Sequence, residues 1–198
     1  MPVRVLCSAE GNLELRSLHR GLAARLFQTV DAERAHLGRW LPWVNTTQGM
    51  PDTVKFLQNA RDAFLRGEGI HGAIWDQDQF VGMMALRVTS KADQVGQVGY
   101  WLSSRAQGRG IISRLLTAFV GYCFREWKLH RLELHCATAN ERSCRVAERV
   151  GFRLEGVMRE ARLVHGAFQD MKIYALLEPE WRAMPGASLA PPTVRPHR

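Results

Sequence analysis

Residues 103–116 read "SSRAQGRGIISRLL" and place a turn with two glycines, flanked by Arg105 and Arg109, before a helix-like segment. A helix that begins near Gly110 leaves its first N–H groups without intrahelical partners, and its dipole adds about half a positive charge there. Gly108 and Gly110 carry no Cβ, so an oxyanion can approach the backbone closely. The same turn also fits a simple change of chain direction with incidental surface arginines. The sequence on either side is needed to distinguish an anion site from such a turn.

The segments around the turn alternate between strand and helix. Residues 96–103 and 131–137 have the composition of strands, and 140–150 that of a short helix. Residues 111–127 give the clearest helical pattern in the chain, because apolar side chains recur there at intervals of three and four. These are Ile112, Leu115, Leu116, Phe119, Val120, Cys123, Phe124 and Trp127.

The remaining elements predict an α/β domain. Residues 12–18 read as a first strand, 19–39 and 52–66 as helices, 69–88 as two strands around a turn at 76–79, and 152–163 with 167–178 as an antiparallel pair. Since the strands between 70 and 102 follow each other without helices, we expect a mixed, largely antiparallel central sheet flanked by helices. In this interpretation residues 1–182 form one domain. The proline-rich residues 183–198 are expected to form a disordered tail.

Composition limits the partners. The chain has 198 residues and a formal charge of +8, and only four of its 27 cationic residues are lysine. This excess indicates an anionic partner without identifying it. The four cysteines form no CxxC pair, and Cys123, Cys136 and Cys144 fall in apolar positions of predicted elements, so we expect reduced core residues and no metal site. No apolar run is long enough for a signal peptide or a membrane span, which favours a cytoplasmic protein.

Two familiar phosphate loops are absent. The pattern GxxxxGK[ST] does not occur, and "GRGIIS" puts Ser113 where a dinucleotide fingerprint needs its third glycine. The order of the remaining motifs is more informative. The strand "VGYWL", the turn "QGRGII", the long helix, the strand "RLELHCAT" and then "NERSCRVAERVGF" closely resemble the GNAT superfamily of acyl-CoA N-acyltransferases. The motifs "HLGRWLPWV" and "GAFQDMKIYAL" narrow the resemblance to the RimJ/RimL type, over about residues 12–180.

The resemblance implies a site for acetyl-CoA as co-substrate, in a splayed opening between the strands 96–103 and 131–137. It implies that backbone groups of Tyr100, Trp101 and Leu102 pair with the pantetheine arm. It also implies that backbone amides hold the pyrophosphate in a loop whose family pattern is [QR]xxGx[GA]; Ile112 takes its last small position here. The loop residues are Gln107, Gly108, Arg109, Gly110, Ile111, Ile112 and Ser113. Asn140 is read both as a helix N-cap and as a ligand of the pantetheine arm.

The resemblance implies a catalytic role for Ser143, which stabilises the leaving thiolate or protonates it; a helix serine without a task is the alternative. The tyrosine common in GNAT enzymes is replaced by Ala147. The glutamate that RimL-like enzymes use is replaced by Arg162. We therefore place the general base first at Glu160, on the same strand face if the strand is regular. His135, His165 and water are the alternatives.

Function follows as an expectation. We expect direct attack of an amine on acetyl-CoA, since no cysteine has a visible His/Asp relay for a covalent route. The acceptor is expected to be the α-amino group of a protein or peptide with acidic residues nearby. The alternatives are a small amine such as a polyamine, amino acid or drug, a basic nucleic-acid-binding module, and a non-catalytic acyl-CoA-binding protein. The arginines are scattered along the chain and no nucleic-acid-binding motif accompanies them, which argues against a nucleic-acid partner. A homodimer is compatible with the sequence.

Overall fold

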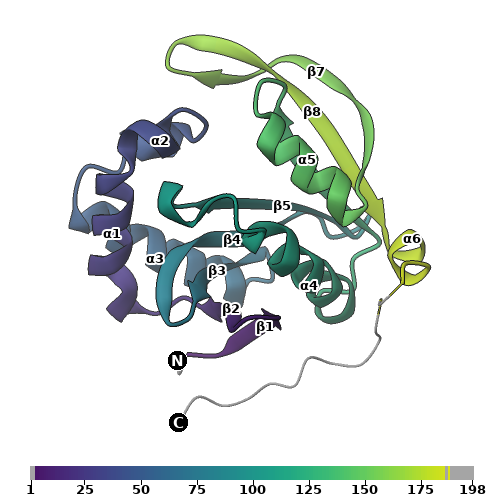
Figure 1. Ribbon diagram of the computed structural model, residues 1–198, viewed down its shortest axis with the longest axis horizontal. Helices are drawn as coiled ribbons and strands as arrows, with labels where there is room; N and C mark the ends of the chain where they lie inside the picture. The colour runs from purple at the N-terminus through teal and green to yellow at the C-terminus, as the bar shows by residue number, and fades with distance from the viewer. Residues whose placement is uncertain (1–2, 186, 188–198) are drawn as a thin grey trace.

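The computed structural model describes residues 3–185 and residue 187, and its elements surround one eight-stranded sheet (Figure 1). The expected tail at 183–198 lies largely outside the described residues. The sheet order is β1-β2-β3-β4-β5-β6-β8-β7. The strands are β1 (Val5–Ala9), β2 (Leu13–Ser17), β3 (Gly69–Asp76), β4 (Gln79–Ser90), β5 (Val95–Leu102), β6 (Arg131–Ala137), β7 (Arg153–Val164) and β8 (Ala167–Leu177).

Neighbouring strands run antiparallel except β5 and β6, which are parallel. The expected mixed, largely antiparallel sheet is therefore confirmed. The parallel step arises because the helix that follows β5 carries the chain back to the same end of the sheet. The helices are α1 (Ala23–Ala32), α2 (Arg34–Gly38), α3 (Met50–Leu65), α4 (Ile111–Glu126), α5 (Glu141–Val150) and α6 (Glu178–Arg182), with 3-10 turns η1 (Arg20–Leu22), η2 (Pro42–Asn45) and η3 (Ser104–Ala106).

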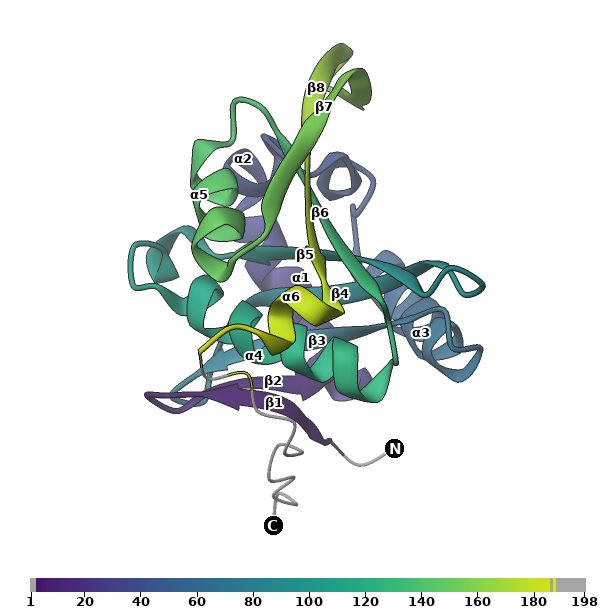
Figure 2. The ribbon, with the colours of Figure 1, turned by 90° about the vertical axis from the view of Figure 1, so that its right-hand side faces the viewer.

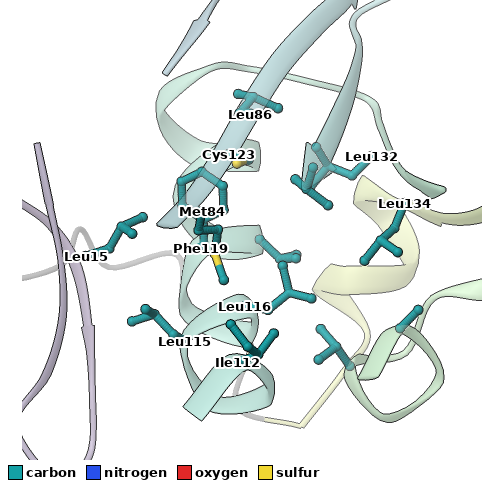
Figure 3. Packing of buried hydrophobic residues seen from close by; sticks show 14 of the residues in the cluster. Leu15, Met84, Leu86, Ile112, Leu115, Leu116, Phe119, Cys123, Leu132 and Leu134 are labelled. Carbon is teal, nitrogen blue, oxygen red and sulfur yellow. The ribbon is translucent and has the colours of Figure 1, made fainter. Parts of the chain in front are cut away.

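Two apolar cores cover the two faces of the sheet. On one face, α4 packs its buried stripe against Leu15, Met84 and Leu132, as Figure 3 shows. A fully buried leucine or phenylalanine in such a layer contributes about 1.5–3 kcal/mol relative to exposure. On the other face, α1, α2 and α3 pack against Phe80 and Trp101. The two layers pack against β5 from both sides, whereas β6 contributes buried residues only to the core that α4 covers.

Some elements differ from the sequence prediction. The segment predicted as one helix over 19–39 divides into η1, α1 and α2, with a break at Glu33. The Glu33 carboxylate accepts hydrogen bonds from Ser103 and Ser104 in the loop after β5. The helix is therefore interrupted at the residue whose side chain binds this distant loop. Strand β1 was not predicted. The last strand ends at Leu177, one residue before α6 begins.

The described part of the chain contains no helix long and apolar enough to cross a membrane. Within the same residues, no group of three or more His, Cys, Asp or Glu side chains is placed to hold a metal ion. The four cysteines are free and buried, as predicted.

Candidate active site

Strands β5 and β6 pair over only the first half of β5. Their register runs from Val95 opposite Arg131 to Val98 opposite Leu134, while β5 continues to Leu102. In Figure 2, β1 to β5 run across the view, whereas β6, β8 and β7 run steeply upward, so the sheet divides at this junction. A cleft of about 1480 Å³ occupies the opening and is lined by the diverging ends of both strands.

The free end of β5 offers backbone to the cleft. Gly99, Tyr100, Trp101 and Leu102 all line it, and an ideal Cβ built on Gly99 would meet nothing within 4 Å. Some N–H and C=O groups of these residues point toward the space that β6 has left. An extended ligand with amide groups can pair with such an edge as an added strand does.

The turn quoted above faces the same cleft. Gly110 is the N-cap of α4 with φ 68°, Gly108 has φ 76°, and a Cβ on either would meet nothing within 4 Å. The first helical hydrogen bond is donated by the Arg114 N–H to the Gly110 carbonyl, which leaves the N–H groups before it without an intrahelical acceptor. The left-handed backbone and the open space suit glycine. The turn thus presents several amides and the positive end of a helix dipole to an anion.

Side chains fasten this turn from outside the cleft. The Arg109 guanidinium lies 2.7 Å from the carboxylate of Asp76, which is buried at the end of β3. Arg114 donates to the carbonyl oxygens of Glu10 and Arg109. Arg109 is thus committed to an ion pair and does not line the cleft, although its backbone belongs to the turn.

Gln107 joins the two walls of the cleft. Its Oε1 accepts a hydrogen bond of 2.7 Å from Arg142 on α5, and its Nε2 lies 2.8 Å from the His36 Nε2 on α2. A residue expected to act through its backbone therefore also makes a bridge with its side chain.

The first turn of α5 carries the hydroxyl group that faces the opening. The Asn140 Oδ1 accepts from the Ser143 N–H at 3.3 Å and so caps the helix. The Ser143 Oγ lies 2.9 Å from the Tyr100 hydroxyl. Burial raises the pKa of Tyr100, and its hydrogen bond with Ser143 opposes that effect only in part. The tyrosine is therefore neutral near neutral pH and can donate a hydrogen bond.

Cys136 lies beside this pair and lines the cleft from β6. Burial raises the pKa of its thiol to about 12, and a hydrogen bond with Ser143 opposes the shift in part. Because the thiolate is the nucleophilic form of cysteine, Cys136 is a poor nucleophile near neutral pH.

Three arginines of α5 form a basic wall at the end of the cleft near the turn. They line the cleft at helical intervals and are Arg142, Arg145 and Arg149. The Arg149 Nη1 donates a hydrogen bond of 2.9 Å to the Ser113 Oγ in the first turn of α4. Guanidinium groups at this spacing suit a ligand with several phosphates.

The other half of the cleft lies under the β7–β8 hairpin. Arg162 and His135 line it, but Glu160 does not. Strand β7 is irregular between Met158 and Arg162, and Glu160 has φ 49° and an exposed side chain. The regular strand assumed for Glu160 is therefore absent, since a bulge changes which side chains share a face.

Contacts at the hairpin tip and α2 close this half. His165 lies 2.9 Å from the Gly38 carbonyl oxygen and 3.2 Å from the Asn45 Nδ2, so it fastens the hairpin to the segment after α2. Trp40 lines the cleft, whereas Trp43 packs beside Trp101 with ring centroids 6.4 Å apart.

Three features of the site were missed by sequence reasoning: the Tyr100 hydroxyl on Ser143, the Arg149 contact with Ser113, and the Gln107 bridge. Each joins elements that are far apart in the chain. The helical spacing of Arg142, Arg145 and Arg149 was the available signal for the basic wall.

Comparison with known proteins agrees with this geometry. The family described as acetyltransferase (GNAT) domain matches residues 12–153. The ribosomal-protein-serine acetyltransferase of Escherichia coli is 29% identical over 164 residues, which cover 83% of this chain and 92% of that protein. The structure of RimL with coenzyme A, a ribosomal alpha-N-protein acetyltransferase, has a TM-score of 0.82 at 28% identity, over 85% of this chain and 95% of that one. Mycobacterium smegmatis RimJ with CoA-disulfide has a TM-score of 0.82 at 26% identity, over 90% and 88% of the two chains.

The predicted resemblance is thereby confirmed, and acetyl-CoA fits the cleft by its chemistry. The amides and arginines of the cleft suit phosphate groups, and the free end of β5 suits an arm that contains amide groups. Because the matched family spans both diverging strands and the whole turn that begins α4, the chain belongs to the GNAT acetyltransferase family and is an N-acetyltransferase that takes its acetyl group from acetyl-CoA.

Proposed function

We propose that this N-acetyltransferase acetylates the free α-amino group of a protein or peptide that carries acidic residues near its N-terminus. The names of the relatives support a protein acceptor, since they are ribosomal-protein acetyltransferases. The observation that carries the acidic preference is the pair of arginines in the acceptor half of the cleft.

Acetyl-CoA would lie with its pyrophosphate on the amides of 107–113 and its pantetheine arm along Tyr100, Trp101 and Leu102. Asn140 sits where that arm would pass. This orientation brings the thioester to the opening beside Ser143, because the arm runs from the turn toward the point where β5 and β6 separate.

The reaction in this proposal is a direct transfer. The amine attacks the thioester carbonyl carbon, and the sulfur leaves as a thiolate. Ser143, backed by the neutral Tyr100 hydroxyl, would stabilise that thiolate by a hydrogen bond, as an oxyanion donor does. A covalent acetyl-cysteine route is disfavoured, because burial raises the pKa of the Cys136 thiol to about 12.

Arg39 and Arg162 support an acidic acceptor. Both line the cleft, Arg39 from the position directly after α2 and Arg162 from β7, and neither forms an ion pair with any residue that the structure describes. Arg39 stacks over the Trp40 ring at 5.0 Å. Unpaired guanidinium groups at the entrance attract carboxylates and repel polyamines. Arg162, which replaces an expected glutamate, thus acquires a role in binding.

An α-amino acceptor also suits the chemistry. An α-amino group has a pKa of about 7.7–8.0 and a lysine side chain one of about 10.4, so the α-amino group supplies far more free amine near neutral pH. The site therefore needs only modest help in removing a proton.

The test is a thiol-release assay on peptides with free Ser or Ala N-termini, acidic or basic in positions two to five, beside spermidine. We expect the acidic peptides to react faster, with an advantage that shrinks as salt is added. Mass spectrometry of the products locates the acetyl group. A preference for spermidine, or acetylation only on lysine side chains, would contradict the proposal.

Arg162→Gln sharpens the assay. It should raise KM for the acidic peptide by ~5- to 20-fold, about the loss of one charge-assisted contact, and leave the basic peptide nearly unchanged. Arg159→Gln is the matched control, because Arg159 is exposed on the same strand and does not line the cleft. Equal effects of the two variants would remove Arg162 from the acceptor site.

A further inference from the structure

We propose that His135 accepts the proton of the attacking ammonium group and that Glu133 positions its imidazole for this step. The inference rests on the proposed acetylation of an α-amino group. Such a group is mostly protonated below pH ~7.7, and only its free form attacks the thioester. A base at the point of attack therefore has a task, and the bulge in β7 leaves Glu160 outside the cleft.

The location of His135 follows from the register of the sheet. Leu134 is the last β6 residue paired with β5, opposite Val98, so His135 is the first residue beyond the point of separation. It lines the cleft there. On β5 the next residue is Gly99, which leaves open space above the strand. A thioester that enters between the strands would meet His135 at its inner end.

The two faces of the sheet separate the two halves of the reaction. Leu134 and Cys136 are buried in the core that α4 covers, so His135, between them, faces the opposite side. Tyr100 packs against the same α4 core and meets Ser143. The hydroxyl pair thus lies on the side of the leaving sulfur, and the imidazole lies on the side from which an amine arrives.

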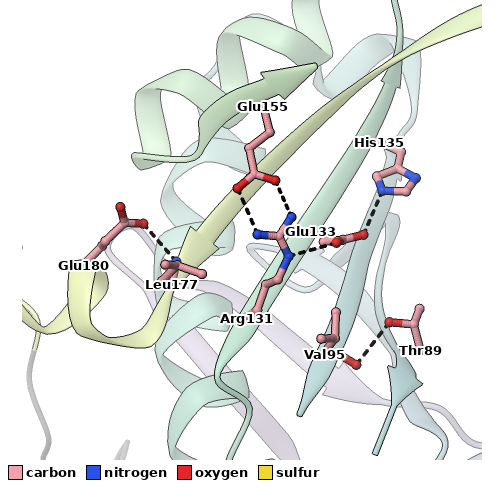
Figure 4. Close-up of polar contacts among 8 residues, drawn as sticks. All are labelled: Thr89, Val95, Arg131, Glu133, His135, Glu155, Leu177 and Glu180. Carbon is pink, nitrogen blue, oxygen red and sulfur yellow. Dashed lines mark hydrogen bonds and ion pairs between the residues drawn. The ribbon is translucent and has the colours of Figure 1, made fainter. Parts of the chain in front are cut away.

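Glu133 holds the imidazole in one orientation, as Figure 4 shows. The His135 Nε2 lies 3.0 Å from the Glu133 Oε2, and the Glu133 Oε1 accepts a hydrogen bond of 2.9 Å from the Arg131 Nε. Arg131 is itself held by Glu155, its hydrogen bond to the Glu155 Oε1 measuring 2.9 Å. Because a carboxylate only accepts, Nε2 carries the hydrogen, and Nδ1 is left with the lone pair that takes a proton.

The other groups near His135 leave this role to it. Its partner on β8 is Ile173, and the level residue on β5 is Gly99, neither of which is charged. Among the described residues, the charged or titratable side chains on this side of the cleft include Glu133 and Arg131 on β6, Glu155 and Arg162 on β7, Arg87 on β4, His71 on β3 and Arg39 directly after α2. Burial lowers the pKa of His71, so it stays neutral and binds a proton less readily.

The protons balance in this sequence of steps. One proton of the ammonium passes to the His135 Nδ1, and the free amine forms the new C–N bond at the thioester carbon. The C–S bond then breaks, and the second amine proton reaches the leaving sulfur through water to give the CoA thiol. The imidazolium returns its proton to water, and the net products are the acetylated amine, CoA and one proton.

The experiment is the pH dependence of kcat/KM for the acidic peptide, measured from about pH 5.5 to 9.5 for wild type, His135→Gln and Glu133→Gln. We expect His135→Gln to lower kcat/KM near pH 7 by ~100-fold and to move the rising limb up toward the titration of the α-amino group at pH ~7.7–8.0. Glu133→Gln should move that limb the other way, because the imidazolium loses its neighbouring carboxylate. A merely structural role cannot shift the limb in opposite directions.

The controls separate this inference from the proposed function. His130→Gln changes an exposed histidine directly before β6 and should retain the wild-type profile. Calorimetry of acetyl-CoA binding verifies that the variants are folded. A wild-type protein that acetylates no peptide amine contradicts the proposed function. A wild type that does, with a limb that stays in place in both variants or moves in His71→Gln instead, overturns the role of His135.

Discussion

The Tyr100 hydroxyl lies 2.9 Å from the Ser143 Oγ, and this contact joins the free end of β5 to the first turn of α5. It spans the cleft at the place where the coenzyme sulfur is proposed to leave. A neutral tyrosine that donates to the serine oxygen leaves the serine proton free to point at the thiolate. In the proposed reaction the pair would therefore act as one donor built from two elements.

Ser143→Ala should lower kcat by ~10- to 1000-fold while acetyl-CoA affinity changes little, because the donor acts on charge that develops in the transition state. Tyr100→Phe should give part of that loss. The two effects should not add in the double variant, since each change removes the same donor. Steady-state kinetics and calorimetry measure both quantities, and unchanged turnover in Ser143→Ala would leave the serine as a helix residue only.

Gly110→Asp should abolish most of the acetyl-CoA affinity. It places a negative side chain at the amides of the turn, and it forces a residue other than glycine to adopt φ 68°. Gly166→Asp is the matched control, because Gly166 has φ 77° and open space around it at the hairpin tip. Both variants should lose stability, but only Gly110→Asp should lose binding in calorimetry. Equal affinities would contradict the phosphate role of the turn.

Asp76→Asn should weaken acetyl-CoA binding without touching the ligand. The change removes the ion pair that fastens Arg109, at 2.7 Å, and lets the turn move. A partly exposed pair contributes roughly 1 kcal/mol, so we expect the Kd to rise ~3- to 10-fold. Arg153→Gln, which breaks an ion pair with Glu180 away from the cleft, should leave the Kd unchanged.

Alkaline pH should destabilise the fold. Burial raises the pKa of Cys7 and of Cys136 from 9.0 to about 12, so in this interval the folded chain keeps protons that the unfolded chain has lost. Their contribution to the free energy of unfolding is complete below pH 9.0 and falls as the pH rises toward 12. Urea unfolding at several alkaline pH values measures the slope. Cys7→Ala should make it shallower, whereas a steeper slope would contradict the burial argument.

Local patterns in the sequence were sufficient for most of the fold. The apolar spacing of residues 111–127 predicted α4 nearly to its ends, and the strands at 96–103 and 131–137 became the parallel pair β5 and β6. The short strand β1 escaped prediction, because five residues with an irregularity between Val5 and Cys7 carry too little alternation. The break at Glu33 also escaped, since its cause lies seventy residues away at Ser103.

The site divides in the same way. The sequence by itself determined that a glycine turn begins α4 and that Asn140 caps the helix bearing Ser143, because backbone conformation and capping depend on near neighbours. Tertiary structure alone decided which side chains meet. The bulge in β7 turned Glu160 out of the cleft, the separation of β5 from β6 placed His135 at its inner end, and packing brought Tyr100 to Ser143. Contacts of this kind depend on register and layer geometry, which no local pattern of residues encodes.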